Sequence, residues 1–254
     1  MKAIKYLSVI FLIFIIIGAF VVWKGSEKKI VLVDQGMVVI QNIVTPTIEV
    51  KKIITKAETV KSIYYEVPFT SQAPFGGWKD PKQQNGCEEA AVLMAVYWAK
   101  GKSLTKQEAL QQIIAISDFE QKTYGEYRDT SAADTLDRII KGYFQYTRAF
   151  TQEITSFDDI YNQLSAGRLV IVPMNGQLLN NPNYTQPGPL EHMVVVKGYD
   201  VQNNEFITND PGTRNGFNYR YPVAVFIAAI RDYPTGYHQP INEIKKVMIV
   251  IEKQ

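Results

Sequence analysis

The 254-residue chain contains only one cysteine and two histidines. A single cysteine excludes an internal disulfide, and so few cysteines and histidines exclude the usual ligand sets of structural zinc. Neither of the common glycine-rich motifs that bind phosphate groups is present. We therefore expect no cofactor and no metal site.

The charge is also nearly balanced. The formal net charge is +2, and the sequence has no basic patch interleaved with aromatic residues. These properties give no support to nucleic-acid binding. The apolar content of 46% and the charged content of 20% are typical of a globular chain with enough apolar residues for a core.

The N-terminus carries a targeting signal. Lys2 and Lys5 precede an uncharged run, Leu7 to Trp23, which Lys24 closes. This run is short for a membrane span and long for the core of a cleavable signal, and no convincing cleavage site follows it. We expect residues 1–23 to form a single-pass signal anchor with the rest of the chain extracytoplasmic. A cleaved secretory signal is the alternative.

The remaining sequence divides into two parts. Residues 24–62 contain short β-favouring pieces and a lysine-rich stretch, which suggest a stalk or a small β appendage. Residues 63–254 contain the longer patterned segments, and we expect them to form the globular domain.

Patterns within the domain predict helices first and strands afterwards. Capping residues and apolar periodicity predict helices over 86–100, 105–116, 131–141 and 156–166. β-Branched runs between turn residues predict strands over 169–173, 193–199, 205–208 and 247–251, whereas 223–230 fits either a strand or a helix. This segregation indicates an α+β fold, not a doubly wound parallel sheet.

The single cysteine, Cys87, lies where a polar loop meets the first helix. Asn85 is a candidate N-cap and Glu88 follows it three residues later, which predicts a capping box with Cys87 in the first turn. The unpaired N–H groups and the dipole of a first turn favour a thiolate, the nucleophilic form of cysteine. The alternative is that Cys87 is an ordinary buried thiol.

A histidine and a carboxylate follow in the order that a thiol hydrolase requires. His192 begins a strand-like run, and Asp210 lies eighteen residues later, so a hairpin would bring the two together. Asp200 competes for the carboxylate role, but it ends the same strand, roughly 25 Å from His192 at the usual rise per residue. We predict that His192 accepts the thiol proton and that Asp210 orients the imidazole.

Other polar residues have weaker assignments. Gln72, Gln83 and Gln84 are candidates for the second donor of an oxyanion hole. We expect Glu88 and Glu89 to face away from the sulfur, because their charges would oppose thiolate formation. His238 is interpreted as a surface residue, and the loop around Trp78 and the segment around Tyr184 as walls of a cleft.

Four motifs in this order resemble the papain-like cysteine peptidases, specifically the broad group related to bacteriocin-leader peptidases. They are Val67-Pro68-Phe69-Thr70-Ser71-Gln72, Asn85-Gly86-Cys87-Glu88-Glu89-Ala90, His192 to Asp200, and Asn209-Asp210-Pro211-Gly212. The resemblance covers about residues 65–250. It implies a papain-like fold, a Cys87-His192-Asp210 triad and an oxyanion donor at Gln72.

The chain departs from that group at three points. The interval from Gln72 to Cys87 is unusually long, so Gln84 is kept as the alternative donor. Glu88 stands where glycine is frequent, and no transporter portion follows the domain. We expect a bacterial cysteine peptidase that acts on a peptide or protein substrate. The alternatives are a cell-wall peptide hydrolase or transpeptidase, and a non-catalytic binding domain on the same scaffold.

Overall fold

The computed structural model describes residues 60–254. The predicted anchor over residues 1–23 lies outside this part of the chain, as does nearly all of the predicted stalk over residues 24–62. Among residues 60–254, no helix combines the length and the apolar character that a membrane span requires.

Local capping explains where the main helices begin and end. Thr105 accepts a hydrogen bond from the backbone of Glu108, and Ser156 forms a complete capping box with Asp159, so two predicted N-termini are confirmed. The helices are α2 (Pro81–Gln84), α3 (Cys87–Ala99), α4 (Lys106–Tyr124), α5 (Ala132–Asp134), the π-helix η2 (Thr135–Tyr143), α6 (Phe157–Ser165), α7 (Gly176–Leu179) and α8 (Val223–Ala229).

Within residues 60–254 the strands form one seven-stranded sheet in which every pair is antiparallel. The order is β2-β7-β3-β4-β5-β6, and β1 also pairs with β4. The strands are β1 (Ile63–Tyr64), β2 (Ala149–Glu153), β3 (Leu169–Met174), β4 (His192–Asp200), β5 (Glu205–Asn209), β6 (Tyr219–Pro222) and β7 (Val247–Ile251). The predicted α+β class is therefore confirmed.

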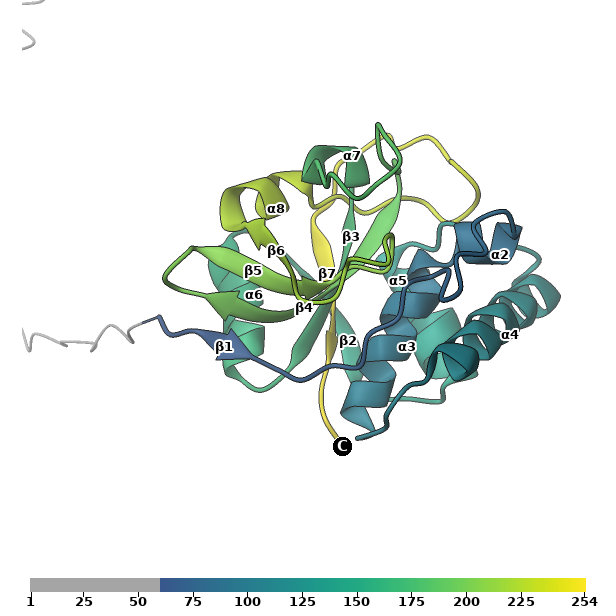
Figure 1. The fold of residues 1–254 in the computed structure, drawn as a ribbon, viewed down its shortest axis with the longest axis horizontal. Coiled ribbons are helices and arrows are strands. Elements are labelled where there is room, and N and C mark those ends of the chain that lie inside the picture. The colour runs from purple at the N-terminus through teal and green to yellow at the C-terminus, as the bar shows by residue number, and fades with distance from the viewer. Residues whose placement is uncertain (1–59) are drawn as a thin grey trace, which may run out of the picture. The chain divides into compact units, whose positions relative to one another are not determined.

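Helices cover both faces of this sheet (Figure 1). Successive residues of a strand point to opposite faces, and β4 follows this rule: Met193 and Val195 join the core under α3 and η2, whereas Val194 and Val196 join the core under α6 and α8. Because both faces are covered, β3 and β7 are apolar along their whole length, and β4 is apolar from Met193 to Val196, with no alternation of polar residues there.

Helix α3 carries the cysteine into the first of these cores. All thirteen of its residues are buried, as its apolar sequence predicted. The predicted cap is wrong, however: Gly86 is the N-cap, and Asn85 instead ends α2, where its side chain donates to the carbonyl of Pro81. Cys87 still lies in the first turn because it is the first residue of the helix.

Two further predictions change in the structure. Helix α4 extends to Tyr124, eight residues beyond its predicted end, and stops at Gly125, which has the positive φ of 81° that glycine adopts without strain. The segment from Val223 that fitted either a strand or a helix is the helix α8.

Candidate active site

Cys87 begins α3 and is 6% exposed. Burial raises the pKa of its thiol well above the usual value, and the neighbouring carboxylate of Glu88 raises it further. The helix N-terminus acts in the opposite direction, but burial and Glu88 outweigh it. The predicted preference for a thiolate is therefore wrong for the resting protein, in which Cys87 is a thiol.

The two glutamates after Cys87 behave differently. Glu88 was expected to face away from the sulfur, yet its Oε2 accepts a hydrogen bond from Sγ over 3.0 Å. Neither carboxylate reaches water, because both residues lie in the buried part of the helix. Glu89 does face away, as expected, and accepts a hydrogen bond from Ser117 on α4.

His192 is the first residue of β4 and is 1% exposed. Its Nε2 forms a hydrogen bond of 2.8 Å with Oδ1 of Asp210, which follows the last residue of β5. Strands β4 and β5 form the antiparallel hairpin that the sequence predicted, with Val195 opposite Asn209. The imidazole therefore directs Nε2 to the carboxylate and keeps Nδ1 for another partner.

Asp210 accepts five hydrogen bonds. Oδ1 accepts from His192 and from the backbone of Gly212, whereas Oδ2 accepts from the side chains of Tyr184, Tyr221 and Asn181. Burial by itself raises the pKa of Asp210, but the facing His192 and these hydrogen bonds more than offset it, so the pKa is lowered. The carboxylate is therefore ionised at neutral pH.

The side chains that donate to Asp210 were not predicted from the sequence. Tyr184 was expected to line a cleft wall, but it is 7% exposed and its ring lies 5.4 Å from that of His192, centroid to centroid. Its hydroxyl and that of Tyr221 each lie 2.5 Å from Oδ2 of Asp210. The spacing of the two tyrosines in the sequence does not predict that they donate to Asp210, because Tyr184 lies in a loop and Tyr221 lies on the outer strand β6.

Two glycines allow the close packing around this pair. A Cβ at Gly212 would lie 2.8 Å from Cε1 of His192, and one at Gly216 would lie 1.8 Å from the carbonyl oxygen of Asp210. Only glycine fits at either position without displacing the His192 ring or the backbone of Asp210.

The motifs that carry the family resemblance meet at this site. Asn209 donates from its side chain to the carbonyls of Val67 and Pro68. The backbone N–H of Gln72 donates to the carbonyl of Pro211 over 2.9 Å. The loop before α3 is thus fastened to the end of β5, where Asp210 lies.

The three glutamines considered for an oxyanion hole differ in their surroundings. Gln72 is buried, and its Nε2 donates to the carbonyls of Gln83 and Gln84, immediately before α3. The side chain of Gln83 donates to Asp80, and that of Gln84 is exposed. As placed, Gln72 holds the loop that leads into Cys87.

Tyr233 links the cysteine helix to the histidine strand. Its hydroxyl donates to Oε1 of Glu88 over 2.6 Å and lies 3.4 Å from the carbonyl oxygen of His192. The residue is 2% exposed and belongs to the same apolar core as Cys87 and Met193. Cys87 and His192 therefore project from α3 and β4, two elements that pack directly on each other.

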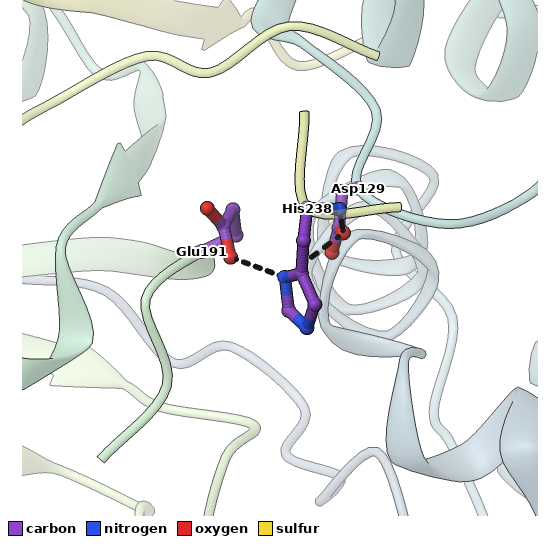
Figure 2. Close-up of side chains that lie close together, drawn as sticks. All are labelled: Asp129, Glu191 and His238. Atoms are coloured by element: carbon purple, nitrogen blue, oxygen red, sulfur yellow. Dashed lines mark hydrogen bonds and ion pairs between the residues drawn. The ribbon is translucent and has the colours of Figure 1, made fainter. Parts of the chain in front are cut away.

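A second polar group joins three loops near this site (Figure 2). His238 is an exposed residue, as predicted, and its Nδ1 also lies 2.8 Å from a carboxylate oxygen of Glu191 and 3.7 Å from one of Asp129. Within residues 60–254 this is the one group whose acidic and imidazole atoms are close enough to hold a metal ion. The contacts within the group account for its arrangement, and we assign no metal to it.

The remaining predictions about the cleft have mixed outcomes. Asp200 pairs with Arg220 at the far end of β4, which agrees with its rejection as the partner of His192. In the loop expected to form a cleft wall, Phe75 is 62% exposed and Trp78 is 40% exposed, so both rings are available at the surface.

Comparison with known proteins gives three results. No curated protein sequence matches the chain. The chain is similar to the crystal structure of a C39-like peptidase from Bacillus anthracis, with 16% identity, a TM-score of 0.48 and coverage of 76% of this chain and 98% of the other. It is also similar to xylellain, a cysteine protease from Xylella fastidiosa, with 15% identity, a TM-score of 0.39 and coverage of 76% and 86%. The model of the Peptidase_C39 like family matches residues 64–239, and the chain therefore belongs to this family.

Proposed function

We propose that the protein is a cysteine peptidase in which Cys87 is the nucleophile, His192 is the general base and acid, and Asp210 orients the imidazole. Membership of the C39-like family supports the peptidase class. The observation that carries the assignment of roles is the buried 2.8 Å hydrogen bond between His192 Nε2 and Asp210 Oδ1, at the end of the sheet where α3 begins. This bond fixes the tautomer and orientation that a catalytic imidazole needs.

The first half of the reaction forms an acyl-enzyme. Sγ of Cys87 attacks the carbonyl carbon of the scissile peptide while Nδ1 of His192 takes the thiol proton. The resulting tetrahedral intermediate collapses when the C–N bond breaks, and His192 gives its proton to the leaving amine. The carboxylate of Asp210 stabilises the imidazolium between these two transfers. Since the resting residue is a thiol, we infer that its proton leaves during substrate attack.

The second half releases the acid product. A water molecule gives a proton to Nδ1 of His192 and adds to the thioester carbon, after which the C–S bond breaks and Cys87 regains its proton. In both halves the negative oxygen needs hydrogen-bond donors. The N–H of Cys87 has no acceptor within α3, because it is the first residue of that helix. Gln72 supplies the second donor if its amide exchanges one loop carbonyl for the substrate oxygen.

A peptidyl vinyl sulfone tests this assignment. The sulfur adds to the vinyl carbon of such a reagent, and the neighbouring carbon then takes a proton, so labelling needs both a nucleophile and an acid. We expect mass spectrometry to find the adduct on Cys87, and His192→Ala to lower the labelling rate by about 100-fold because the proton donor is lost.

Asp200→Asn is the matched control for this experiment, because it removes a carboxylate from the same strand, at the end remote from His192. Its labelling rate is expected to stay within about twofold of that of the unsubstituted protein. Labelling of Cys87 at equal rates with and without the His192 imidazole would contradict the proposed pairing.

We also propose that the catalytic domain is held outside the cytoplasm by residues 1–23. The support is the uncharged run after Lys2 and Lys5. In a bacterial host, the full chain is expected to sediment with the membranes and to be degraded by protease added to cells whose outer envelope has been opened. A chain that is protected from the protease, or recovered in the soluble cytoplasmic fraction, would contradict this placement.

A further inference from the structure

The carboxyl group of Glu88 lies between the cysteine and the histidine strand. Its Oε2 is 3.0 Å from Sγ of Cys87, and its Oε1 accepts a hydrogen bond of 2.6 Å from Tyr233. The residue is 1% exposed, so no water competes for these contacts. Tyr233 in turn lies 3.4 Å from the carbonyl oxygen of His192. Each carboxylate oxygen of Glu88 therefore has its own hydrogen-bond partner, Cys87 for Oε2 and Tyr233 for Oε1.

This geometry determines where the thiol proton points. The sulfur is the donor to Glu88, so in the resting protein its proton is directed at this carboxylate and not at His192. A thiolate and a carboxylate at this separation would repel each other strongly, because burial removes the screening that water provides. At least one proton therefore stays within the Cys87–Glu88 pair.

We propose that Glu88 restrains the nucleophile: its carboxylate holds the Cys87 sulfhydryl, keeps the sulfur protonated at rest, and so sets the pH range in which a thiolate forms. The inference rests on the proposed function only in naming Cys87 as the nucleophile. The restraint is a hydrogen bond and a charge effect, so no covalent bond forms or breaks within the pair. In the proposed reaction the thiol proton still leaves to Nδ1 of His192, and no other reactant is consumed.

The surroundings of Glu88 place its titration near neutrality. Burial, followed by the charge of Asp129, raises its pKa to about 7. Below that pH Glu88 is neutral and able to donate to a thiolate, whereas above it the carboxylate is charged and opposes ionisation of the sulfur. The other groups that bear on this pair are Glu89 on the same helix, Glu120 on α4, Tyr233 on the segment after α8, and Glu191 and His238 beyond Asp129.

One consequence concerns the protection of the sulfur. The thiolate is the form that oxidants attack. A carboxylate that keeps the sole thiol protonated between turnovers therefore lowers its exposure to oxidation, which is useful to a protein that works outside the cytoplasm.

Glu88→Gln tests the restraint without changing the size of the side chain. The amide oxygen can still accept from Tyr233, while its N–H₂ group donates to the sulfur and carries no charge. We expect the thiolate to form at a pH at least one unit lower than in the unsubstituted full chain, which gives about tenfold more thiolate at pH 7. The measurement is the ultraviolet absorbance of the thiolate against pH, after subtraction of the matched protein that carries Cys87→Ala.

Because Cys87 is the sole cysteine, this difference reports one group and cancels the ionisation of the tyrosines. Circular dichroism at each pH verifies that the protein is folded. Glu89→Gln is the matched control: it replaces the adjacent buried carboxyl group, whose pKa burial raises well above the usual value and which accepts from Ser117 and does not touch the sulfur, and the thiol titration is expected to move much less.

A second variant covers the case in which Glu88→Gln does not fold. Tyr233→Phe removes the hydrogen bond that lowers the pKa of Glu88, so Glu88 stays neutral to higher pH and more thiolate is expected at pH 7. A titration that is unchanged or moved to higher pH in the folded variants would overturn the restraint. Because the absorbance needs no turnover, this result is separate from any failure of peptide hydrolysis.

Discussion

Cys87→Ser is expected to lower kcat/KM for peptide hydrolysis by at least about a thousandfold. A serine hydroxyl is far harder to deprotonate than a thiol, and the nearby Glu88 carboxylate would oppose an alkoxide even more than it opposes a thiolate. The substitution barely changes the volume at the start of α3, so the fold is expected to remain intact. The measurement is the release of amines from casein by the purified full chain.

Cys87→Ala is the companion variant. It removes the nucleophile entirely, and its rate is expected to equal that of Cys87→Ser, because neither hydroxyl nor methyl can form the thioester. Purified peptidoglycan is assayed in parallel, since release of amines from it but not from casein would favour the cell-wall alternative. Hydrolysis of either substrate by Cys87→Ala at the unsubstituted rate would exclude a cysteine mechanism.

The parts of the site that the sequence predicted are those encoded by local pattern. The apolar run after Gly86 predicts a buried helix, because only a helix covered on all sides lacks a polar face. The interval between His192 and Asp210 predicts a hairpin, because antiparallel neighbours in sequence pair with each other. Both inferences depend on short-range geometry that the chain specifies directly.

Contacts between distant elements could not be predicted in the same way. The direction in which Glu88 points is decided by Tyr233, which lies 145 residues later in the chain. The hydroxyl groups that hold Asp210 come from Tyr184 in a loop and Tyr221 on β6. Such partners are determined by tertiary packing, and the sequence around a tyrosine does not predict which carboxylate its hydroxyl will contact.

Asp210→Ala is expected to have the second large effect, on stability as well as on activity. Five donors converge on this buried carboxylate, and alanine would remove the acceptor that they share. We expect the free energy of unfolding to fall by about 3 kcal/mol or more at pH 7, and kcat/KM to fall by about a thousandfold because the imidazole loses its orienting partner. Urea unfolding and peptide hydrolysis measure the two effects.

The pH dependence of the stability loss separates the carboxylate from the packing of the side chain. The pKa of Asp210 is lower in the folded protein than in the unfolded chain, so its contribution is complete above about pH 4 and disappears as the pH falls through the native value. The difference between Asp210→Ala and the unsubstituted protein is therefore expected to narrow in acid. A difference that stays constant with pH would show that the charge of Asp210 contributes nothing.

Asp210→Asn is the matched conservative variant. Its amide oxygen can still accept from His192 and Gly212, and its N–H₂ group can face the hydroxyls of Tyr184 and Tyr221, which are able to turn and accept. Most contacts survive while the charge is lost, so we expect a decrease in kcat/KM of about 10- to 100-fold and a stability loss near 1 kcal/mol. If the asparagine variant is as inactive as the alanine variant, the charge on Asp210 is essential to the reaction; if it is fully active, orientation of His192 alone is sufficient.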